Sequence, residues 1–239
     1  MIATSQTLAI ENLSAGYGET QVLWDVSMRI EPGETVALIG SNGAGKSSLL
    51  AAISGLIRVS SGHVRFGDAD LTNLAPDRIV RAGVIQVPQG RRLFNSLSVE
   101  ENLLMGAFLR NDKEVKSDVE RILNLLPRIR ERYDFLAGRL SGGEQQQVAI
   151  ARALMARPKM LLIDEMSLGL APVLVDQLLE ILKAIHDSGV AIMMVEQDVQ
   201  TALEFSTRAY VLETGRVTIS GPSAELLDDP QVKKAYLGV

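Results

Sequence analysis

Short, nearly uniform apolar runs alternate with longer amphipathic runs along much of this 239-residue chain. The apolar runs predict buried strands of a parallel sheet, because helices cover both faces of such a sheet. They are Thr35–Ile39, Met160–Ile163 and Ala191–Val195. The amphipathic runs predict helices at Ser47–Ile53, Asp118–Leu126, Glu144–Met155 and Leu174–His186. This alternation predicts an α/β domain with a parallel sheet between helices.

Three other regions of the chain, two pairs of predicted strands and one long segment, follow different patterns. Thr7–Leu13 and Gln21–Ile30 alternate apolar and polar residues, which predicts two strands with a turn at Gly16-Tyr17-Gly18. Arg208–Glu213 and Arg216–Ser220 predict a second hairpin. Residues 89–157 contain almost no strand signal, so we predict a helical subdomain there, inserted in a single domain whose core covers about residues 1–88 and 158–239.

Composition narrows the possible settings. The net charge of −5 gives no general electrostatic reason to bind nucleic acid or an anionic membrane. The chain has no cysteine, which excludes disulfides and thiolate metal sites and favours a reducing cytoplasm. No apolar run approaches the roughly 20 residues that span a bilayer, and the first residues do not resemble a signal peptide. We therefore expect any membrane association to come through a partner.

A glycine-rich segment directly follows the first apolar run, and its pattern predicts a phosphate-binding loop. Glycines let backbone N–H groups approach phosphate oxygens closely, and the N-terminus of the next helix favours an anion. Lys46 can place its charge on the β and γ phosphates, and the Ser47 hydroxyl can bind magnesium. The predicted nucleotide-binding residues here are Gly40, Ser41, Asn42, Gly43, Ala44, Gly45, Lys46, Ser47 and Ser48. This segment by itself indicates only that a nucleotide binds.

Two carboxylates end the apolar run Met160–Ile163, which places Asp164 and Glu165 at the carboxyl edge of the predicted sheet, beside the phosphate loop. We predict that Asp164 holds magnesium and that Glu165 orients or deprotonates the attacking water. An exposed acidic pair at a strand end is the simpler alternative, but it does not explain the phosphate loop in the same chain.

Ser141-Gly142-Gly143-Glu144 opens a predicted helix. Ser141 is suited to cap that helix, with Glu144 in its first turn. A helix N-terminus with a free serine hydroxyl and two glycines is also a second candidate anion site.

Together, the phosphate loop, the segment Leu140–Gln146 and the run Leu161–Glu165 resemble the ATP-binding cassette (ABC) family, and the resemblance extends over essentially the whole chain. It implies a P-loop NTPase fold with a RecA-like parallel core, an N-terminal antiparallel β subdomain and an inserted helical subdomain. It also implies an ATPase that uses ATP and Mg²⁺ at the interface of a head-to-tail dimer. Ser141, Gly142, Gly143 and Glu144 would then serve the nucleotide held by the other subunit.

The resemblance assigns further residues. Tyr17 stands where the family has an aromatic ring that stacks on adenine, and an exposed ring in a glycine turn suits this role. Gln89 matches a glutamine that senses magnesium and couples to the membrane subunit, and it adds to Ser47 and Asp164 as a metal-site residue. The segment Ser167–Leu170 matches the loop that crosses the dimer beside the catalytic carboxylate.

Two positions depart from the family pattern. Gln197 replaces a histidine that contacts the γ-phosphate; an amide can donate a hydrogen bond but cannot carry a proton charge. We keep Gln197 as a catalytic candidate beside Glu165. Met166 replaces a proline, and the loss of the fixed φ leaves two outcomes open, a looser loop after Glu165 or no effect.

Several segments are similar to the ATPases of branched-chain and hydrophobic amino acid importers. They are Val87–Phe94, Leu97–Ala107, Ser167–Pro172, Val195–Gln197 and Tyr236–Val239. This similarity implies two permease subunits, a second ABC ATPase subunit in a heterodimer or homodimer, an indirectly linked periplasmic binding protein, and a peripheral location on the cytoplasmic face of the inner membrane.

Three alternatives remain at this stage. The ATPase of a lipopolysaccharide-type exporter is also a short single cassette with a similar ending. A soluble ABC ATPase of translation or DNA repair would usually carry two cassettes or a long coiled coil. A P-loop kinase would leave the segment Ser141–Glu144 without a role.

Overall fold

The computed structural model describes residues 6–237 and contains two sheets. The strands are β1 Leu8–Tyr17, β2 Thr20–Ile30, β3 Thr35–Ile39, β4 Val59–Phe66, β5 Ala69–Asp70, β6 Val84–Val87, β7 Met160–Asp164, β8 Ala191–Val195, β9 Arg208–Glu213 and β10 Arg216–Pro222. Two predictions fall partly outside the described residues. Residues 1–5 belong to the N-terminal stretch that does not resemble a signal peptide, and residues 238–239 end the segment Tyr236–Val239.

A six-stranded sheet with the order β10-β9-β3-β8-β7-β6 forms the centre of the molecule. Its strands from β9 to β6 pair in parallel, and β10 adds an antiparallel edge. The second sheet is antiparallel with the order β2-β1-β4-β5. The sequence prediction of a parallel core beside an N-terminal antiparallel unit is therefore confirmed.

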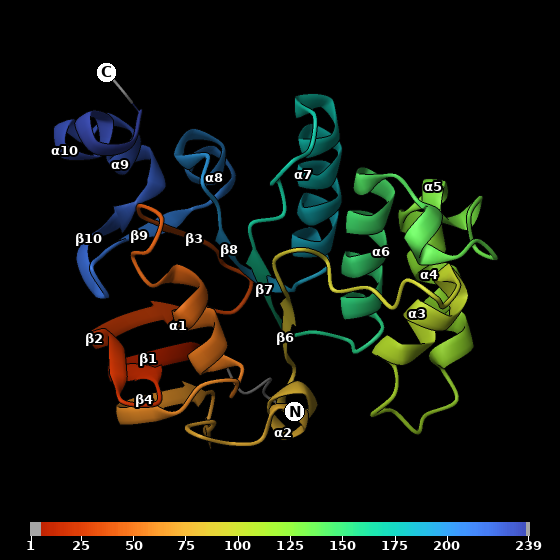
Figure 1. Ribbon diagram of the computed structural model, residues 1–239, viewed down its shortest axis with the longest axis horizontal. Helices are drawn as coiled ribbons and strands as arrows, with labels where there is room; N and C mark the ends of the chain where they lie inside the picture. Colours follow the sequence, from red (N-terminus) through yellow and green to blue (C-terminus); the bar gives the residue numbers. More distant parts are fainter. Residues whose placement is uncertain (1–5, 238–239) are drawn as a thin grey trace.

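The helices cover the central sheet and extend to one side of it (Figure 1). They are α1 Lys46–Ile53, α2 Pro76–Ala82, α3 Val99–Gly106, α4 Val115–Leu125, α5 Pro127–Arg130, α6 Gly142–Leu154, α7 Pro172–Asp187, α8 Val199–Phe205, α9 Ser223–Asp228 and α10 Pro230–Val232, with short turns η1 Ala137–Arg139 and η2 Lys233–Leu237. In Figure 1, α3 to α6 form a group on the right, and α7 stands between this group and the left-hand part of the molecule.

Alternation along the central strands divides the core in two. In β3, Ala37 and Ile39 belong to a cluster that includes side chains of α3, α4, α6, α7 and α8. Val36 and Leu38 belong to a cluster that includes side chains of β1, β2, β4 and α1. Successive residues of a strand point to opposite faces, so the uniformly apolar run is explained by burial on both sides. All five residues of β3 are buried.

The predicted turn at Gly16-Tyr17-Gly18 needs correction. Tyr17 is not in a turn: it is the last residue of β1 and pairs with Thr20, which leaves the turn at Gly18 and Glu19.

Residues 89–157 contain no strand, although Ser98 and Leu136 form one isolated bridge. The division into a core and an inserted subdomain at residues 89–157 stays a prediction.

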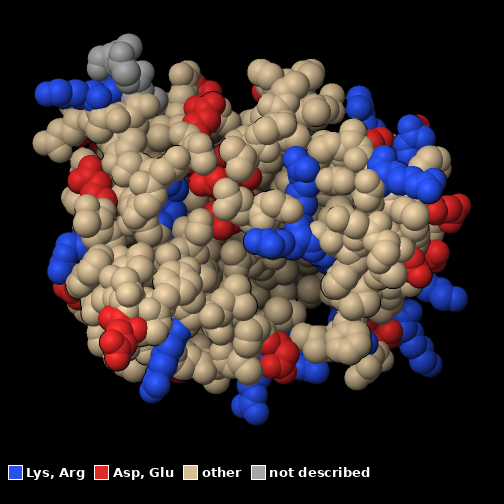
Figure 2. Space-filling view, in the orientation of Figure 1, with Lys and Arg blue, Asp and Glu red and all other residues tan. Residues whose placement is uncertain are grey.

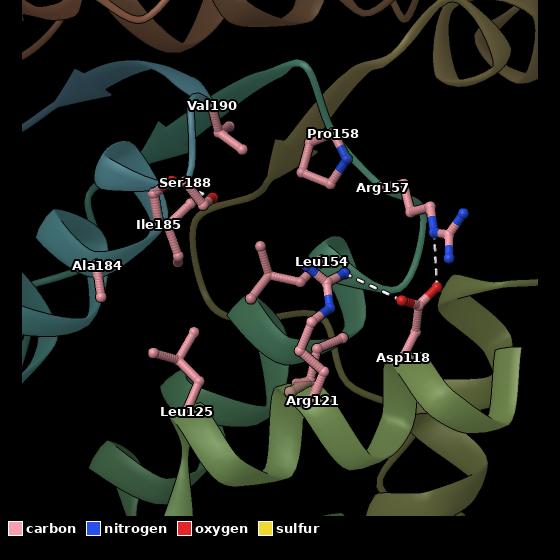
Figure 3. A pocket seen from close by; sticks show the side chains of 11 residues that line it. Asp118, Arg121, Leu125, Leu154, Arg157, Pro158, Ala184, Ile185, Ser188 and Val190 are labelled. Carbon is pink, nitrogen blue, oxygen red and sulfur yellow. Dashed lines mark hydrogen bonds and ion pairs between the residues drawn. The ribbon is translucent and has the colours of Figure 1, made fainter. Parts of the chain in front are cut away.

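A cavity of about 580 Å³ lies where α4 faces the end of α7 (Figure 3). Its floor is apolar, with Ile122, Leu125 and Ile185 among its lining residues. Asp118 stands at its rim and pairs with Arg121 and Arg157, as the dashed lines in Figure 3 show. None of the lining residues belongs to the phosphate loop.

Candidate active site

The glycine-rich loop connects β3 to α1, as its spacing predicts. The helix begins at Lys46, and the residue before it, Gly45, adopts a left-handed conformation. Gly40 has a φ of 156°, and a Cβ there would lie 2.2 Å from the Leu212 carbonyl oxygen. Only glycine fits such a close backbone approach. The start of the loop therefore lies directly against β9.

Lys46 is folded against its own loop. Its Nζ donates hydrogen bonds to the Gly40 carbonyl at 2.7 Å and to the Ser41 carbonyl at 3.1 Å. Burial lowers the pKa of Lys46, and the negative charges of Glu165 and Asp164 act in the opposite direction. These two carbonyls accept hydrogen bonds from two of the three N–H groups of the ammonium. One N–H group stays available for a phosphate oxygen.

Ser47 and Asp164 meet although they are 117 positions apart in the sequence. Ser47 Oγ donates a hydrogen bond to Asp164 Oδ1 at 3.1 Å. Burial raises the pKa of Asp164 and the nearby charge of Glu165 adds to this, whereas the bond from Ser47 acts in the opposite direction. A hydroxyl and a carboxylate oxygen this close are suitable neighbouring ligands for a hard cation.

Glu165 is the meeting point of two amide side chains. Gln89 Nε2 lies 2.6 Å from Glu165 Oε2, and Gln197 Nε2 lies 2.9 Å from the same oxygen. Glu165 is only 8% exposed and has a φ of 47°, an uncommon conformation for a non-glycine residue. The structure thus brings together Glu165, Gln89 and Gln197, which the sequence had indicated separately.

A pocket of about 310 Å³ lies over the phosphate loop and includes Glu165 in its lining. The lining residues are Val22, Asn42, Gly43, Gly45, Lys46, Ser47, Ser48 and Glu165. Val22 was not predicted from the sequence, because an apolar residue at the start of a strand carries no sign of ligand contact.

Tyr17 lies next to the phosphate-loop pocket. The ring is 53% exposed, and its hydroxyl is 3.4 Å from Ser48 Oγ. It lines a neighbouring hollow of about 770 Å³ together with residues 15–21 and 56–60. An exposed ring beside the phosphate loop is suitable for stacking on a base, and this role stays a prediction.

Ser141 is the N-cap of α6, as predicted. Its side chain accepts a bond from the Glu144 N–H, and the Glu144 side chain accepts from the Ser141 N–H, which forms a capping box. The expectation of a free hydroxyl is wrong, because Ser141 Oγ also donates to Glu144 Oε2 at 2.7 Å. Glu144 is further paired with Arg132 at 3.3 Å. Neither Gly142 nor Gly143 lines the pocket over the phosphate loop.

Arg91 connects the residues after Gln89 to α6, a contact that the sequence did not reveal. Its Nη1 donates to Gln145 Oε1 at 3.1 Å, so the segment after Gln89 is attached to the first turn of α6. Arg152, further along α6, donates to the carbonyl oxygens of Arg91 and Arg92 at 3.0 and 2.8 Å. These bonds connect residues 89–92, called the Gln89 segment below, to α6.

The loop after Glu165 is not loose. Met166 is 1% exposed and packs in the core, and the hydroxyl and N–H of Ser167 both donate to the carboxylate of Glu196. Of the two outcomes left open for the missing proline, these contacts favour no effect over a looser loop. Sequence analysis gave Glu196 no role, although a charged residue directly after the buried β8 was a detectable signal.

Comparison with known proteins decides the family. A family model described as ABC transporter matches residues 23–167. The high-affinity branched-chain amino acid transport ATP-binding protein BraG of Pseudomonas aeruginosa is 46% identical over 97% of this chain and 99% of its own length. The chain belongs to the ABC transporter family.

Two further relatives place this ABC ATPase more broadly. The lipopolysaccharide export system ATP-binding protein LptB of Escherichia coli K12 is 34% identical over 97% of each chain. A solved ATP-binding cassette of an ABC transporter in its ADP conformation is 29% identical, with a TM-score of 0.86 over 98% of this chain and 99% of that one. The predicted family, the P-loop ABC ATPase fold and the ATPase activity are confirmed by these relationships.

The described residues of this ABC ATPase supply only some of the oxygen ligands that a magnesium ion needs. Ser47 Oγ and Asp164 Oδ1 are adjacent oxygen ligands. Within residues 6–237, no group of three or more His, Cys, Asp or Glu side chains is arranged to hold a metal. Magnesium keeps several waters and binds through one or two protein oxygens plus substrate phosphates. The residues present therefore fit a metal that arrives with the nucleotide.

The surface and helices of the ABC ATPase add two observations. None of the helices in the described part of the chain combines the length and apolar character that a bilayer crossing requires. Positive and negative side chains are interspersed on the face in Figure 2, without a broad area of one sign.

Proposed function

We propose that this chain is the ATP-hydrolysing motor subunit of an ABC importer for branched-chain or other hydrophobic amino acids. The observation that carries the proposal is the 46% identity to BraG over 97% of this chain. The exporter alternative rests on the lower identity of 34% to LptB over an equal share.

In the proposed reaction, ATP is the substrate and binds over the loop between β3 and α1. Lys46 keeps its contacts with the Gly40 and Ser41 carbonyls and binds the terminal phosphates through its remaining N–H group. Magnesium, held by Ser47 and Asp164, neutralises phosphate charge when it is bound. Tyr17 stacks on adenine from its position beside Ser48.

Glu165 is the proposed base that orients the attacking water. Its carboxylate is held by Gln89 and Gln197, which come from segments after β6 and β8. When these amides turn to the phosphate of the nucleotide, Glu165 becomes available to the attacking water. Hydrolysis is thereby linked to the presence of the complete nucleotide.

A second cassette completes the site in this proposal. Ser141, Gly142 and Gly143 would contact the γ-phosphate held by the partner cassette, and the helix N-terminus there suits an anion. Their absence from the lining of this chain's own phosphate pocket supports that arrangement. The partner would supply the same segment in return, as a homodimer or a heterodimer.

The permease subunits would contact a groove beside the Gln89 segment. This groove of about 580 Å³ is lined by Phe94, Met105 and Phe108 among others, and Phe108 is 76% exposed. Gln86 Oε1 is buried near it without a hydrogen-bond partner in the described residues. An exposed apolar groove suits a protein partner. The ATPase would then lie on the cytoplasmic face of the membrane.

The test is a pull-down of the tagged chain from gently solubilised native membranes, followed by mass spectrometry. We expect two permeases and a cassette subunit, with a periplasmic binding protein linked through the permeases. Phe108→Ser should reduce recovery of the permeases at least fivefold. Phe135→Ser, an exposed aromatic outside the groove, is the matched control. Recovery of ribosomal or DNA-repair proteins without a membrane subunit would refute the transport proposal.

A further inference from the structure

Glu196 is a buried acid that the proposed reaction does not use. It follows β8 directly and is 1% exposed. Burial and, more weakly, the charge of Glu165 raise its pKa, while bonds from Ser167 and Met166 act in the opposite direction. A carboxyl group this buried is costly unless donors surround it. Its donors all come from one short loop.

The bonds of Glu196 join two loops. Ser167 Oγ lies 2.5 Å from Glu196 Oε2, and the Ser167 N–H donates to Glu196 Oε1 at 3.2 Å. The loop after β7 is therefore attached to the residue that follows β8 through two donors of Ser167.

The next residue makes a second connection between the same two loops. Gln197 donates its amide to Glu165 at 2.9 Å, and the Glu165 N–H donates to the Val195 carbonyl at 2.8 Å. Glu196 and Gln197 are consecutive, and their partners Ser167 and Glu165 are two positions apart. A backbone displacement at Gln197 therefore moves Glu196 and, through its bonds, Ser167.

We propose that Glu196 is a positioning residue that ties residues 166–170 to Gln197, so that movement of Gln197 on nucleotide binding is passed to this loop. The inference rests on the proposed function, in which Gln197 responds to the terminal phosphate and the loop lies beside the partner cassette. Glu196 does not touch the nucleotide, and it acts through Ser167 and Gln197.

The test compares hydrogen exchange of residues 166–170 in the purified full-length chain, with and without magnesium and a non-hydrolysable ATP analogue. We expect the analogue to slow exchange of this loop in the wild type. Glu196→Gln should bind the analogue with an affinity within about twofold of wild type but lose at least four-fifths of the slowing, because the amide replaces one acceptor by a donor. If the wild-type protein binds the analogue and exchange of residues 166–170 does not slow, the inference is overturned. If the wild-type protein does not bind the nucleotide at all, the proposed function itself is overturned.

Matched variants separate this role from a general loss of stability. Ser167→Ala should repeat the effect and Ser167→Thr, which keeps a hydroxyl, should restore the slowing. Glu204→Gln changes an exposed acid on α8 and should leave the slowing intact. In a Gln197→Ala background, Glu196→Gln should add less than a further twofold change, because both act on one path. Additive effects, or faster exchange throughout both sheets, would assign Glu196 a purely structural role and contradict the proposal.

Discussion

Gln197 donates its side-chain amide to Glu165 Oε2 at 2.9 Å, and this oxygen also accepts from Gln89 at 2.6 Å. Two neutral donors from different segments therefore fix the carboxylate that is proposed to activate water. A glutamine can hold Glu165 by hydrogen bonding alone, which accounts for its presence where the family usually has a histidine.

Gln197→Ala should lower kcat about 100-fold with little change in KM for ATP, because one positioned donor is lost near the reacting atoms. Gln197→His keeps a donor, so its kcat at pH 8 should stay within about tenfold of wild type. The imidazole should add a pH dependence near its ordinary pKa of about 6.5. Steady-state ATPase assays between pH 6 and 9 provide the measurement, and unchanged kcat in the alanine variant would remove Gln197 from the site.

Glu165→Gln should reduce kcat at least 100-fold while ATP still binds, because the amide keeps the size of the side chain but cannot accept a proton. With ATP and magnesium the variant should accumulate as a closed dimer of cassettes. Sedimentation analysis and ATPase assays together test this. Turnover at the wild-type rate would show that Glu165 is not the base.

Lys46→Ala should weaken ATP binding by about 2–3 kcal/mol, or roughly 30- to 150-fold, because a charged donor to phosphate is lost. Titration with a fluorescent ATP analogue measures this. Lys183→Ala on α7, where the lysine is exposed, is the control and should bind normally. Equal affinity of the Lys46 variant and wild type would refute the assignment of the phosphate loop.

Asp118→Asn should destabilise the fold by about 2 kcal/mol at pH 7, because a buried carboxylate loses its charged bonds with Arg110 and Arg157. Both arginines keep a second acid, Asp112 and Glu114, which limits the loss. The Asp118 side chain is 5% exposed and lies 2.7 Å from both Arg110 and Arg157. Burial alone would raise the pKa of Asp118, but the bonds from Arg157 and Arg110 lower it below its ordinary value of 3.8.

The sign of the pH dependence follows from that lowered pKa. A folded-state pKa below the unfolded one gives stability that is present above about pH 4 and is lost as the pH falls through the folded pKa. Urea unfolding should therefore show the wild type and Asp118→Asn converging below about pH 4. Asp228→Asn, at an exposed acid paired with Lys233, should leave the unfolding midpoint unchanged. A constant difference between wild type and Asp118→Asn down to pH 2 would contradict the prediction.

Much of the local structure could be predicted from the sequence. The runs that form β3, β7 and β8 were correct to within one residue, and Ser141 caps α6 as its spacing with Glu144 indicates. The sequence did not reveal β4, because its Ser-Ser-Gly stretch resembles a turn. The four residues of β6 are too few for a clear period.

The sequence by itself determined the phosphate loop, the acidic end of β7 and the cap of α6, because each depends on neighbours only a few residues apart. Only the tertiary structure decided that Gln89 and Gln197, 76 and 32 positions from Glu165, would meet on one oxygen. It also decided that Glu196 would hold Ser167. The physical reason is the strand order β3-β8-β7-β6, which places the ends of distant segments at one edge of the sheet. That order results from burying the apolar faces of the whole chain together.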